Sequence, residues 1–176
     1  MRVEIGARAP DFEARTWQGK ELRLTDFRGQ KLWLAFFRYA SCPLCNLRVH
    51  HIIEGHAQWK EAGIEIVAVF QSPASSIDRY VGRQSPPFPI VPDPEERLYA
   101  TYGLGASMRA FMSPMNLGRL NAAAMKGYIP GKVEGTMGRI PGDFLVDEEG
   151  VLREAYYGKV IADHIPMERV DAFLSS

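Results

Sequence analysis

The stretch KLWLAFFRYASCPLCNLRV, residues 31–49, decides the expected fold. Residues 31–39 form a nearly continuous apolar run, which is typical of a strand covered on both faces of a sheet. From residue 42 to about residue 62, apolar side chains recur on one side at helical spacing, and Gly63 closes the pattern. The sequence therefore predicts a buried strand that leads directly into a helix.

Strands and helices alternate along the rest of the chain. The predicted strands are ELRLTDF, IEIVAVF, FPIV, DFLVD and VLREAYYG, and the further predicted helices are SSIDRYVGR, PEERLYAT and IPMERVDAFL. Asp93 is expected to cap the second of these helices, with Pro94 in its first turn and Gly103 at its end. Residues 104–138 hold six glycines and five of the seven methionines, which we interpret as an insertion with some helix over residues 108–126. We expect one α/β domain over residues 1–176, with the insertion before the last hairpin.

Charge and composition exclude several classes of partner. Lys plus Arg equals Asp plus Glu at 21 each, so no net field favours nucleic acid or an anionic membrane. The start, MRVEIGARAPDFE, is charged where a signal peptide needs an apolar run, and no stretch of the chain has the length of apolar sequence that a membrane span requires. We therefore expect a cytoplasmic protein with no nucleic-acid or membrane partner.

The chain has two cysteines, Cys42 and Cys45, and both fall in the first turn of the expected helix. Ser41 is available as the cap, and Pro43 is tolerated because first-turn amides lack partners within the helix. Those amides and the helix dipole favour a thiolate, above all at Cys42. A spacing of three lets Cys45 resolve an intermediate formed on Cys42, so the pair predicts a two-electron redox switch.

Other uses of these residues are less well supported by their spacing. A c-type haem site needs His directly after the second cysteine, where Asn46 stands. A zinc or copper site needs further ligands, and the four histidines are poorly placed for it: His50, His51, His56 and His164. We expect ordinary packing or surface positions for these histidines, and two inert buried cysteines stay an alternative.

Several segments resemble a known group of proteins. They are GARAPDF, LTDFRGQKLWLAFFR, CPLCNLRV, FPIVPDPEERLYATYG and IPGDFLVDEEGVL. The chain resembles the thioredoxin-fold superfamily, and more closely the CxxC-bearing branch of the AhpC/TSA peroxiredoxin-like proteins related to selenoprotein L and the peroxiredoxin-like 2 proteins. The resemblance implies a thioredoxin-like fold, a central mixed sheet with helices on both faces. It also implies that Pro141 is a cis-proline facing the cysteines and leaves the Ile140 backbone free for a substrate strand; a trans proline opening a strand is the alternative.

The match departs from the usual peroxiredoxin motif P-x-x-x-T-x-x-C. If its last cysteine is placed on Cys45, Arg38 stands at the proline and Cys42 at the threonine. The arginine usual before the FLVD-type strand is replaced by Pro141, with Arg139 two residues away. Arg38 can supply positive charge to a thiolate or peroxide, and Arg48 is a weaker candidate. Thioredoxin logic favours Cys42 as the attacking cysteine and the peroxiredoxin alignment favours Cys45, so that choice stays open.

Methionines recur in the insertion at spacings of four and three, at Met108, Met112 and Met115. The simplest interpretation is a stripe that packs into the core, and the alternative is a flexible apolar surface for organic hydroperoxides or a partner protein.

The sequence as a whole predicts a thiol-dependent redox enzyme. It would reduce hydroperoxides through a Cys42/Cys45 thiol-disulfide cycle, supported by Arg38, Pro43, Ile140 and Pro141. It would need no bound cofactor or metal, and an external dithiol protein of the thioredoxin or glutaredoxin type would reset it. A protein disulfide reductase is the first alternative and a non-enzymatic metal-binding or redox-sensing module the second. A homodimer is possible.

Overall fold

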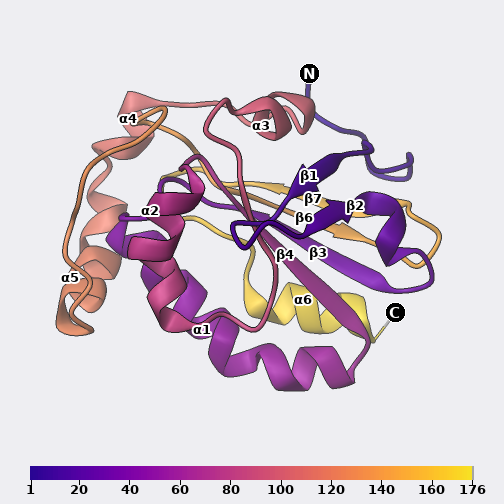
Figure 1. Ribbon diagram of the computed structural model, residues 1–176. Helices are drawn as coiled ribbons and strands as arrows, with labels where there is room; N and C mark the ends of the chain where they lie inside the picture. The colour runs from indigo at the N-terminus through magenta and orange to yellow at the C-terminus, as the bar shows by residue number, and fades with distance from the viewer. Residues whose placement is uncertain (176) are drawn as a thin grey trace.

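The computed structural model describes residues 1–175 and is built around one five-stranded sheet (Figure 1). The strand order is β5-β4-β3-β6-β7. The strands are β3 (Lys31–Phe36), β4 (Ile64–Phe70), β5 (Ile90–Pro92), β6 (Gly142–Val146) and β7 (Leu152–Tyr157). A separate antiparallel ribbon joins β1 (Glu13–Arg15) and β2 (Glu21–Arg23).

The sheet is mixed, as predicted. Strand β3 lies at its centre, parallel to β4 and antiparallel to β6, and β6 forms an antiparallel hairpin with β7. Leu34 is opposite Val67 on one side and Phe144 on the other, so the apolar run of β3 has a strand on each edge.

Helices cover both faces of the sheet. The α-helices are α1 (Pro43–Glu61), α2 (Ala74–Arg79), α3 (Arg97–Thr101), α4 (Met108–Phe111), α5 (Leu117–Met125) and α6 (Met167–Leu174). The 3-10 turns are η1 (Leu24–Phe27), η2 (Val81–Gln84) and η3 (Pro114–Asn116). In Figure 1, α1 and α6 lie below the sheet and α3 lies above it. None of the helices within residues 1–175 combines the length and the apolar character needed to cross a membrane.

Two apolar clusters, one on each face, explain why β3 is apolar throughout. Trp33 and Phe37 belong to the cluster under α1 and α6, whereas Leu34 and Phe36 belong to the cluster under α3 and the N-terminal segment. Successive residues of a strand point to opposite faces, so both sets are buried by one short strand.

Helix α3 begins three residues later than predicted. Its N-cap is Glu96, not Asp93, and Pro94 precedes the helix. The side chain of Asp93 still accepts hydrogen bonds from the amides of Arg97 and Leu98, at 3.0 and 2.8 Å. Asp93 therefore satisfies first-turn amides from outside the helix, while Glu96 adopts a left-handed backbone conformation at φ 56°.

Residues 104–138, the expected insertion, lie before the final hairpin, but Met108, Met112 and Met115 do not pack into the core. Met108, Met112 and Met115 are 53%, 77% and 71% exposed. The predicted stripe fails because α4 is a single turn that ends before Ser113, and the 3-10 turn η3 follows. These methionines therefore lie at the surface of the molecule rather than in an internal seam.

Candidate active site

The two cysteines lie where β3 passes into α1. Cys42 is the N-cap of α1, and Pro43 occupies the first helical position, as predicted. Ser41 is not the cap. Both thiols are free, and the residues are 1% and 2% exposed. The helix start therefore holds two reduced sulfurs in an environment closed to water.

The environment of Cys42 favours its thiolate. Burial raises its pKa, but a hydrogen bond from the Cys45 thiol, the charge of Arg38 and the amides of Cys45 and Leu44 outweigh burial and lower the pKa to about 6. One guanidinium nitrogen of Arg38, Nη1, lies 3.4 Å from the Cys42 sulfur. At neutral pH the thiolate form of Cys42 is therefore favoured.

Cys45 has the opposite environment. Burial, the hydrogen bond that it donates to Cys42 and the negative charge of Cys42 raise its pKa well above the usual value. The sequence left open which cysteine attacks. Electrostatics favour Cys42 as the attacking group and Cys45 as the resolving group.

Arg38 is held in place from three sides. Its Nη2 donates to the carbonyl of Met137 at 2.5 Å, and its guanidinium lies over the rings of Tyr39 and Phe111. Its Nε is buried without a hydrogen-bond partner. Arg38 is thus a buried cation beside Cys42 whose Nε has no hydrogen-bond partner, and its supporting role stays a prediction.

Asn46 fixes the turn before the helix. Its amide donates to the carbonyls of Ala40 and Cys42 at 2.8 and 2.9 Å, and Gln84 donates to its Oδ1 at 3.0 Å. The sequence analysis used Asn46 only to exclude a c-type haem site and did not predict this role. Asparagine side chains commonly form hydrogen bonds with nearby backbone groups in this way.

The end of the insertion packs against Ser41 and Arg38, which adjoin Cys42 in sequence and in space respectively. Ser41 donates through Oγ to the carbonyl of Lys132 at 2.7 Å, and Arg38 contacts the carbonyl of Met137. A Cβ atom on Gly131 would lie 2.7 Å from the Cβ of Ser41, which is closer than two carbons can pack. The segment over residues 131–137 thus needs glycine at this point of contact.

We predict that Gly131→Ala makes Cys42 more accessible, because the added methyl group must displace the segment over residues 131–137 from Ser41. The rate of alkylation of the reduced protein by iodoacetamide should rise by about threefold or more. Gly118→Ala is the matched control, since nothing lies within 4 Å of its added carbon. Equal alkylation rates in both variants would contradict this account of the segment.

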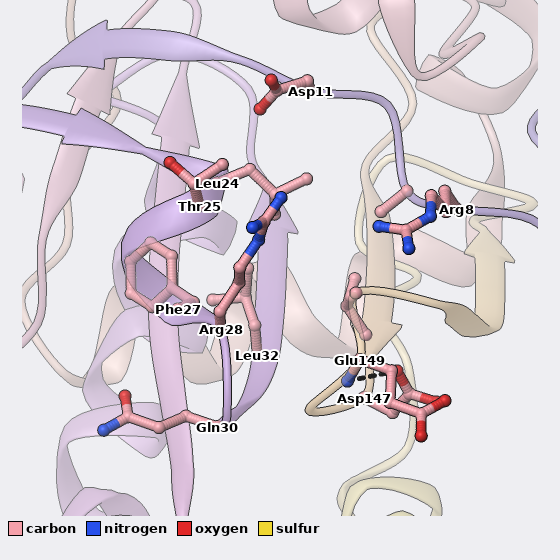
Figure 2. Close-up of a pocket in the computed structure, with 13 residues that line it drawn as sticks. Arg8, Asp11, Leu24, Thr25, Phe27, Arg28, Gln30, Leu32, Asp147 and Glu149 are labelled. Carbon is pink, nitrogen blue, oxygen red and sulfur yellow. Dashed lines mark hydrogen bonds between the residues drawn. The ribbon is translucent and has the colours of Figure 1, made fainter.

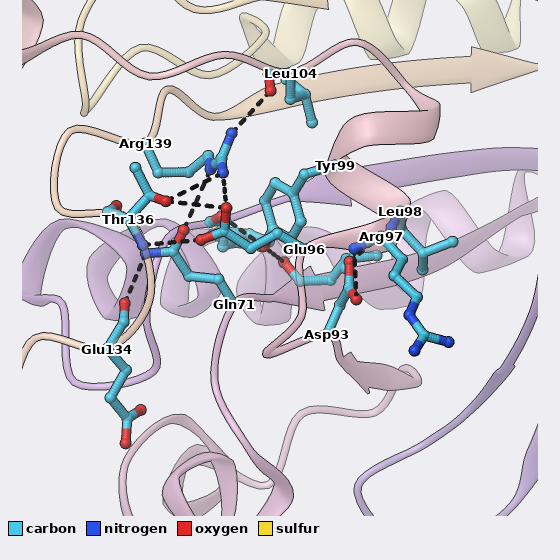
Figure 3. Close-up of polar contacts among 12 residues, drawn as sticks. Gln71, Asp93, Glu96, Arg97, Leu98, Tyr99, Leu104, Glu134, Thr136 and Arg139 are labelled. Carbon is cyan, nitrogen blue, oxygen red and sulfur yellow. Dashed lines mark hydrogen bonds and ion pairs between the residues drawn. The ribbon is translucent and has the colours of Figure 1, made fainter.

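A buried polar network anchors the segment over residues 131–137 (Figure 3). Glu96 accepts from the amide and hydroxyl of Thr136 at 2.8 and 3.0 Å and forms an ion pair with Arg139. Arg139 also donates to the carbonyl of Leu104 at 2.8 Å, and Gln71 donates to the carbonyl of Thr136 at 3.0 Å. Arg139 therefore fastens the two ends of the insertion to each other and to α3, while Arg38 is the arginine that contacts Cys42.

A second buried network joins β3, β6 and the loop before α6, and no sequence pattern predicted it. Asp143 accepts from Trp33 Nε1 and the amide of Ile165, both at 2.9 Å, and its Oδ2 lies 3.0 Å from His164 Nδ1. Burial acts to raise the pKa of Asp143, but interaction with His164, with Arg48 and with the Ile165 amide outweighs burial and holds this pKa below its usual value. His164 is therefore a partner of a buried carboxylate rather than a surface residue.

The expected cis-proline is wrong: the Ile140–Pro141 bond is trans. The backbone of Ile140 is also occupied, because its amide donates to the carbonyl of Gly105 at 3.1 Å. The start of the insertion bridges to this segment through Ala106 and Arg139. The insertion thus pairs with the Ile140 backbone, which the resemblance implied would be free to bind a substrate strand.

Within residues 1–175, neither a metal cluster nor the hollow at the far end of the sheet adds a second reactive centre. Residues 1–175 contain no group of three or more His, Cys, Asp or Glu side chains placed to hold a metal ion. A hollow at the far end of the sheet, near the start of β3, has mixed charges and no nucleophile; Figure 2 shows its lining, including Arg8, Asp11, Arg28, Asp147 and Glu149. The reactive groups are therefore those at the start of α1.

We predict that the ultraviolet absorbance of the Cys42 thiolate titrates with a midpoint of about pH 6. Arg38→Met should raise this midpoint because it removes the neighbouring cation, and Arg38→Lys, which keeps the charge, should raise it less. The free energy of unfolding of the reduced protein, relative to Cys42→Ala, should increase from pH 6 to about pH 8.5, since the unfolded thiol still binds the proton that folded Cys42 has lost. A midpoint above pH 8 in the parent protein would contradict the assignment.

The fold and the cysteine pair define a thioredoxin-fold thiol protein, and comparison with known proteins gives its family. The sequence profile of the AhpC/TSA family matches residues 5–155. The chain belongs to the AhpC/TSA family.

Individual relatives agree with this assignment. The thiol-disulfide oxidoreductase ResA of Geobacillus thermodenitrificans is 31% identical over 115 residues, which are 65% of this chain and 66% of that relative's length. The solved structures of peroxidoxin BcpB from Mycobacterium tuberculosis and of a cysteine-to-serine mutant of PrxQ from Xylella fastidiosa share the fold, with TM-scores of 0.70 and 0.72. They are 15% and 14% identical, the alignments cover 99% of this chain in each case, and they cover 96% and 95% of the two solved chains. The family match and the ResA relative support thiol-dependent redox chemistry, and the solved structures show the shared fold.

Proposed function

We propose that this protein is an oxidoreductase that reduces hydroperoxides through Cys42 and Cys45. The observation that carries the proposal is the contact between Arg38 and the Cys42 sulfur at 3.4 Å, inside a buried site. The cation stabilises the thiolate. The Nε–H of Arg38, which has no partner, can donate a hydrogen bond to a peroxide oxygen.

The proposed cycle has three steps. The Cys42 thiolate attacks one peroxide oxygen, the O–O bond breaks, and the other oxygen leaves and takes a proton from solvent to give water or an alcohol. The Cys45 thiol then attacks the sulfenic acid on Cys42, so an S–S bond forms and water leaves. An external dithiol of the thioredoxin or glutaredoxin type returns two electrons and two protons by disulfide exchange.

The burial of both sulfurs favours a small oxidant. A hydroperoxide needs only a narrow opening between the insertion and the start of α1, whereas a disulfide on a folded protein needs the segment over residues 131–137 to move away. We place the cycle in the cytoplasm, where dithiol systems keep free cysteines reduced. A homodimer stays a prediction that sedimentation can test.

A rapid-mixing experiment tests the proposal. Reduced protein is mixed with hydrogen peroxide, with an organic hydroperoxide and with oxidised glutathione, and formation of the Cys42–Cys45 disulfide is followed by the change in tryptophan fluorescence and by mass spectrometry. We expect either peroxide to oxidise the protein at least about tenfold faster than the disulfide does. Faster exchange with glutathione disulfide would overturn the peroxidase assignment.

The second candidate is a thiol-disulfide oxidoreductase, the activity in the name of the ResA relative, and it would use the same pair of cysteines. A non-enzymatic metal-binding module is the third. Stoichiometric zinc or copper in the purified protein would support it, because a tightly held metal occupies the thiolates that the cycle needs.

A further inference from the structure

A small hollow runs along α1 and starts at Leu44, which lies next to Cys45 in the sequence. It is enclosed by α1, by α5 and by the loop before α6, and its lining is Leu44, Leu47, Arg48, His51, Arg119, Ala162 and His164. The residues from α1 are spaced as one helical stripe, and Leu44 stands between the two cysteines. The hollow therefore begins one residue before Cys45 along α1.

The lining is basic. Four of its seven residues are arginine or histidine, and none is acidic. Among residues 1–175, neither Arg48 nor Arg119 forms an ion pair with a carboxylate. The acidic groups nearby are engaged elsewhere or lie outside the lining: Asp143 is bonded to His164 and Trp33, and Glu168 and Glu54 act only at a distance on Arg48 and His51.

Each of the two arginines is held by a hydrogen bond to a backbone carbonyl, but each keeps N–H donors without a partner. Each donates to a backbone carbonyl of the loop before α6 at 2.5 Å, Arg48 to Ile165 and Arg119 to Ala162. Arg48 also lies over the ring of Trp33, and its Nε is buried without a partner. A guanidinium has five N–H donors, so donors remain on both side chains for an anion in the hollow.

We infer that this hollow binds the carboxylate of the substrate that reacts at the cysteines. The inference rests on the proposed redox function and names its substrate class: a small hydroperoxide or disulfide with a carboxylate a few bonds from the reactive O–O or S–S bond. Leu44 and Leu47 contact the short apolar segment between the carboxylate and that bond, while Arg48 and Arg119 hold the charged end.

Binding can be measured without any reaction. The probe is 3,3′-thiodipropionate, a dicarboxylate thioether that cannot oxidise a thiol, added to the reduced full-length protein in an NMR titration. We expect chemical-shift changes centred on the lining residues, lost in Arg119→Ala and weakened by salt. Arg109→Ala, which removes an exposed arginine of the insertion outside the hollow, is the matched control and should titrate as the parent does. Shifts that are absent, or that persist in Arg119→Ala, overturn the inference.

Kinetics with matched pairs of compounds then show whether the substrate that carries the carboxylate is a disulfide or a hydroperoxide. One pair is 3,3′-dithiodipropionate and neutral 2-hydroxyethyl disulfide, and the other is a short hydroperoxy carboxylic acid and its methyl ester. We expect Arg119→Ala to raise KM about fivefold for the charged member of the reactive pair and less than about twofold for the neutral member, with kcat unchanged. Equal effects on both members overturn the carboxylate subsite while leaving the redox function intact. Thiodipropionate binding with no reaction toward any of the four compounds overturns the redox function and the subsite's role in it.

Discussion

Cys42→Ser should lower the rate at which peroxide oxidises the protein by about 10³-fold or more, because a serine hydroxyl is not ionised at neutral pH and cannot replace a thiolate of pKa about 6. Loss of peroxide in solution, followed at substoichiometric oxidant, measures the effect. The remaining thiol, Cys45, should react slowly because burial and its neighbour Cys42 raise its pKa in the parent protein, and burial still acts in the variant.

Cys45→Ser is the matched control for that experiment. It keeps the attacking sulfur and removes the resolving one, so one equivalent of peroxide should be consumed rapidly and Cys42 should remain as a sulfenic acid. A dimedone adduct on Cys42, detected by mass spectrometry, identifies this product. If Cys45→Ser were the inert variant and Cys42→Ser the reactive one, the roles of the two cysteines would be reversed.

Asp143→Ala should lower the free energy of unfolding by about 3–5 kcal/mol, the range measured when one partner of a buried ion pair is removed. The substitution leaves Trp33 Nε1, the Ile165 amide and the buried His164 ring without their common acceptor. Urea denaturation of the reduced protein at pH 7 measures the loss.

The control is Glu21→Ala, which breaks an ion pair with Arg15 whose side chains are 72% and 67% exposed. Exposed pairs contribute little, so this variant should lie within about 0.5 kcal/mol of the parent protein. A loss for Asp143→Ala as small as that for Glu21→Ala would mean that water enters the network and replaces the carboxylate.

The strand-helix junction could be predicted from sequence because its signals are local. An apolar run, a proline at the first helical position and a glycine after the last turn place β3 and α1 close to their observed bounds. The position of Cys42 at the helix start follows from the same pattern, and so does the direction of its pKa shift.

Most of what the sequence did not predict concerns contacts between segments far apart in the chain, and one error is local. Asp143 and His164 are 21 residues apart, and neither shows any local sign of the other. The methionine spacing indicated one helix, yet Ser113 and Pro114 interrupt it and expose the methionines. The trans bond at Pro141 and the occupied Ile140 amide depend on the insertion, whose path no short motif describes.

The segment over residues 131–137 is held by main-chain atoms at its two contacts beside Cys42. Ser41 and Arg38 bind the carbonyl oxygens of Lys132 and Met137, which any amino acid at those positions would supply. In evolution, side chains there can change freely and retune the outer surface, whereas adding or deleting one residue between Gly131 and Met137 would shift the carbonyls out of register. At these two contacts the length of the segment matters more than the side chains at positions 132 and 137.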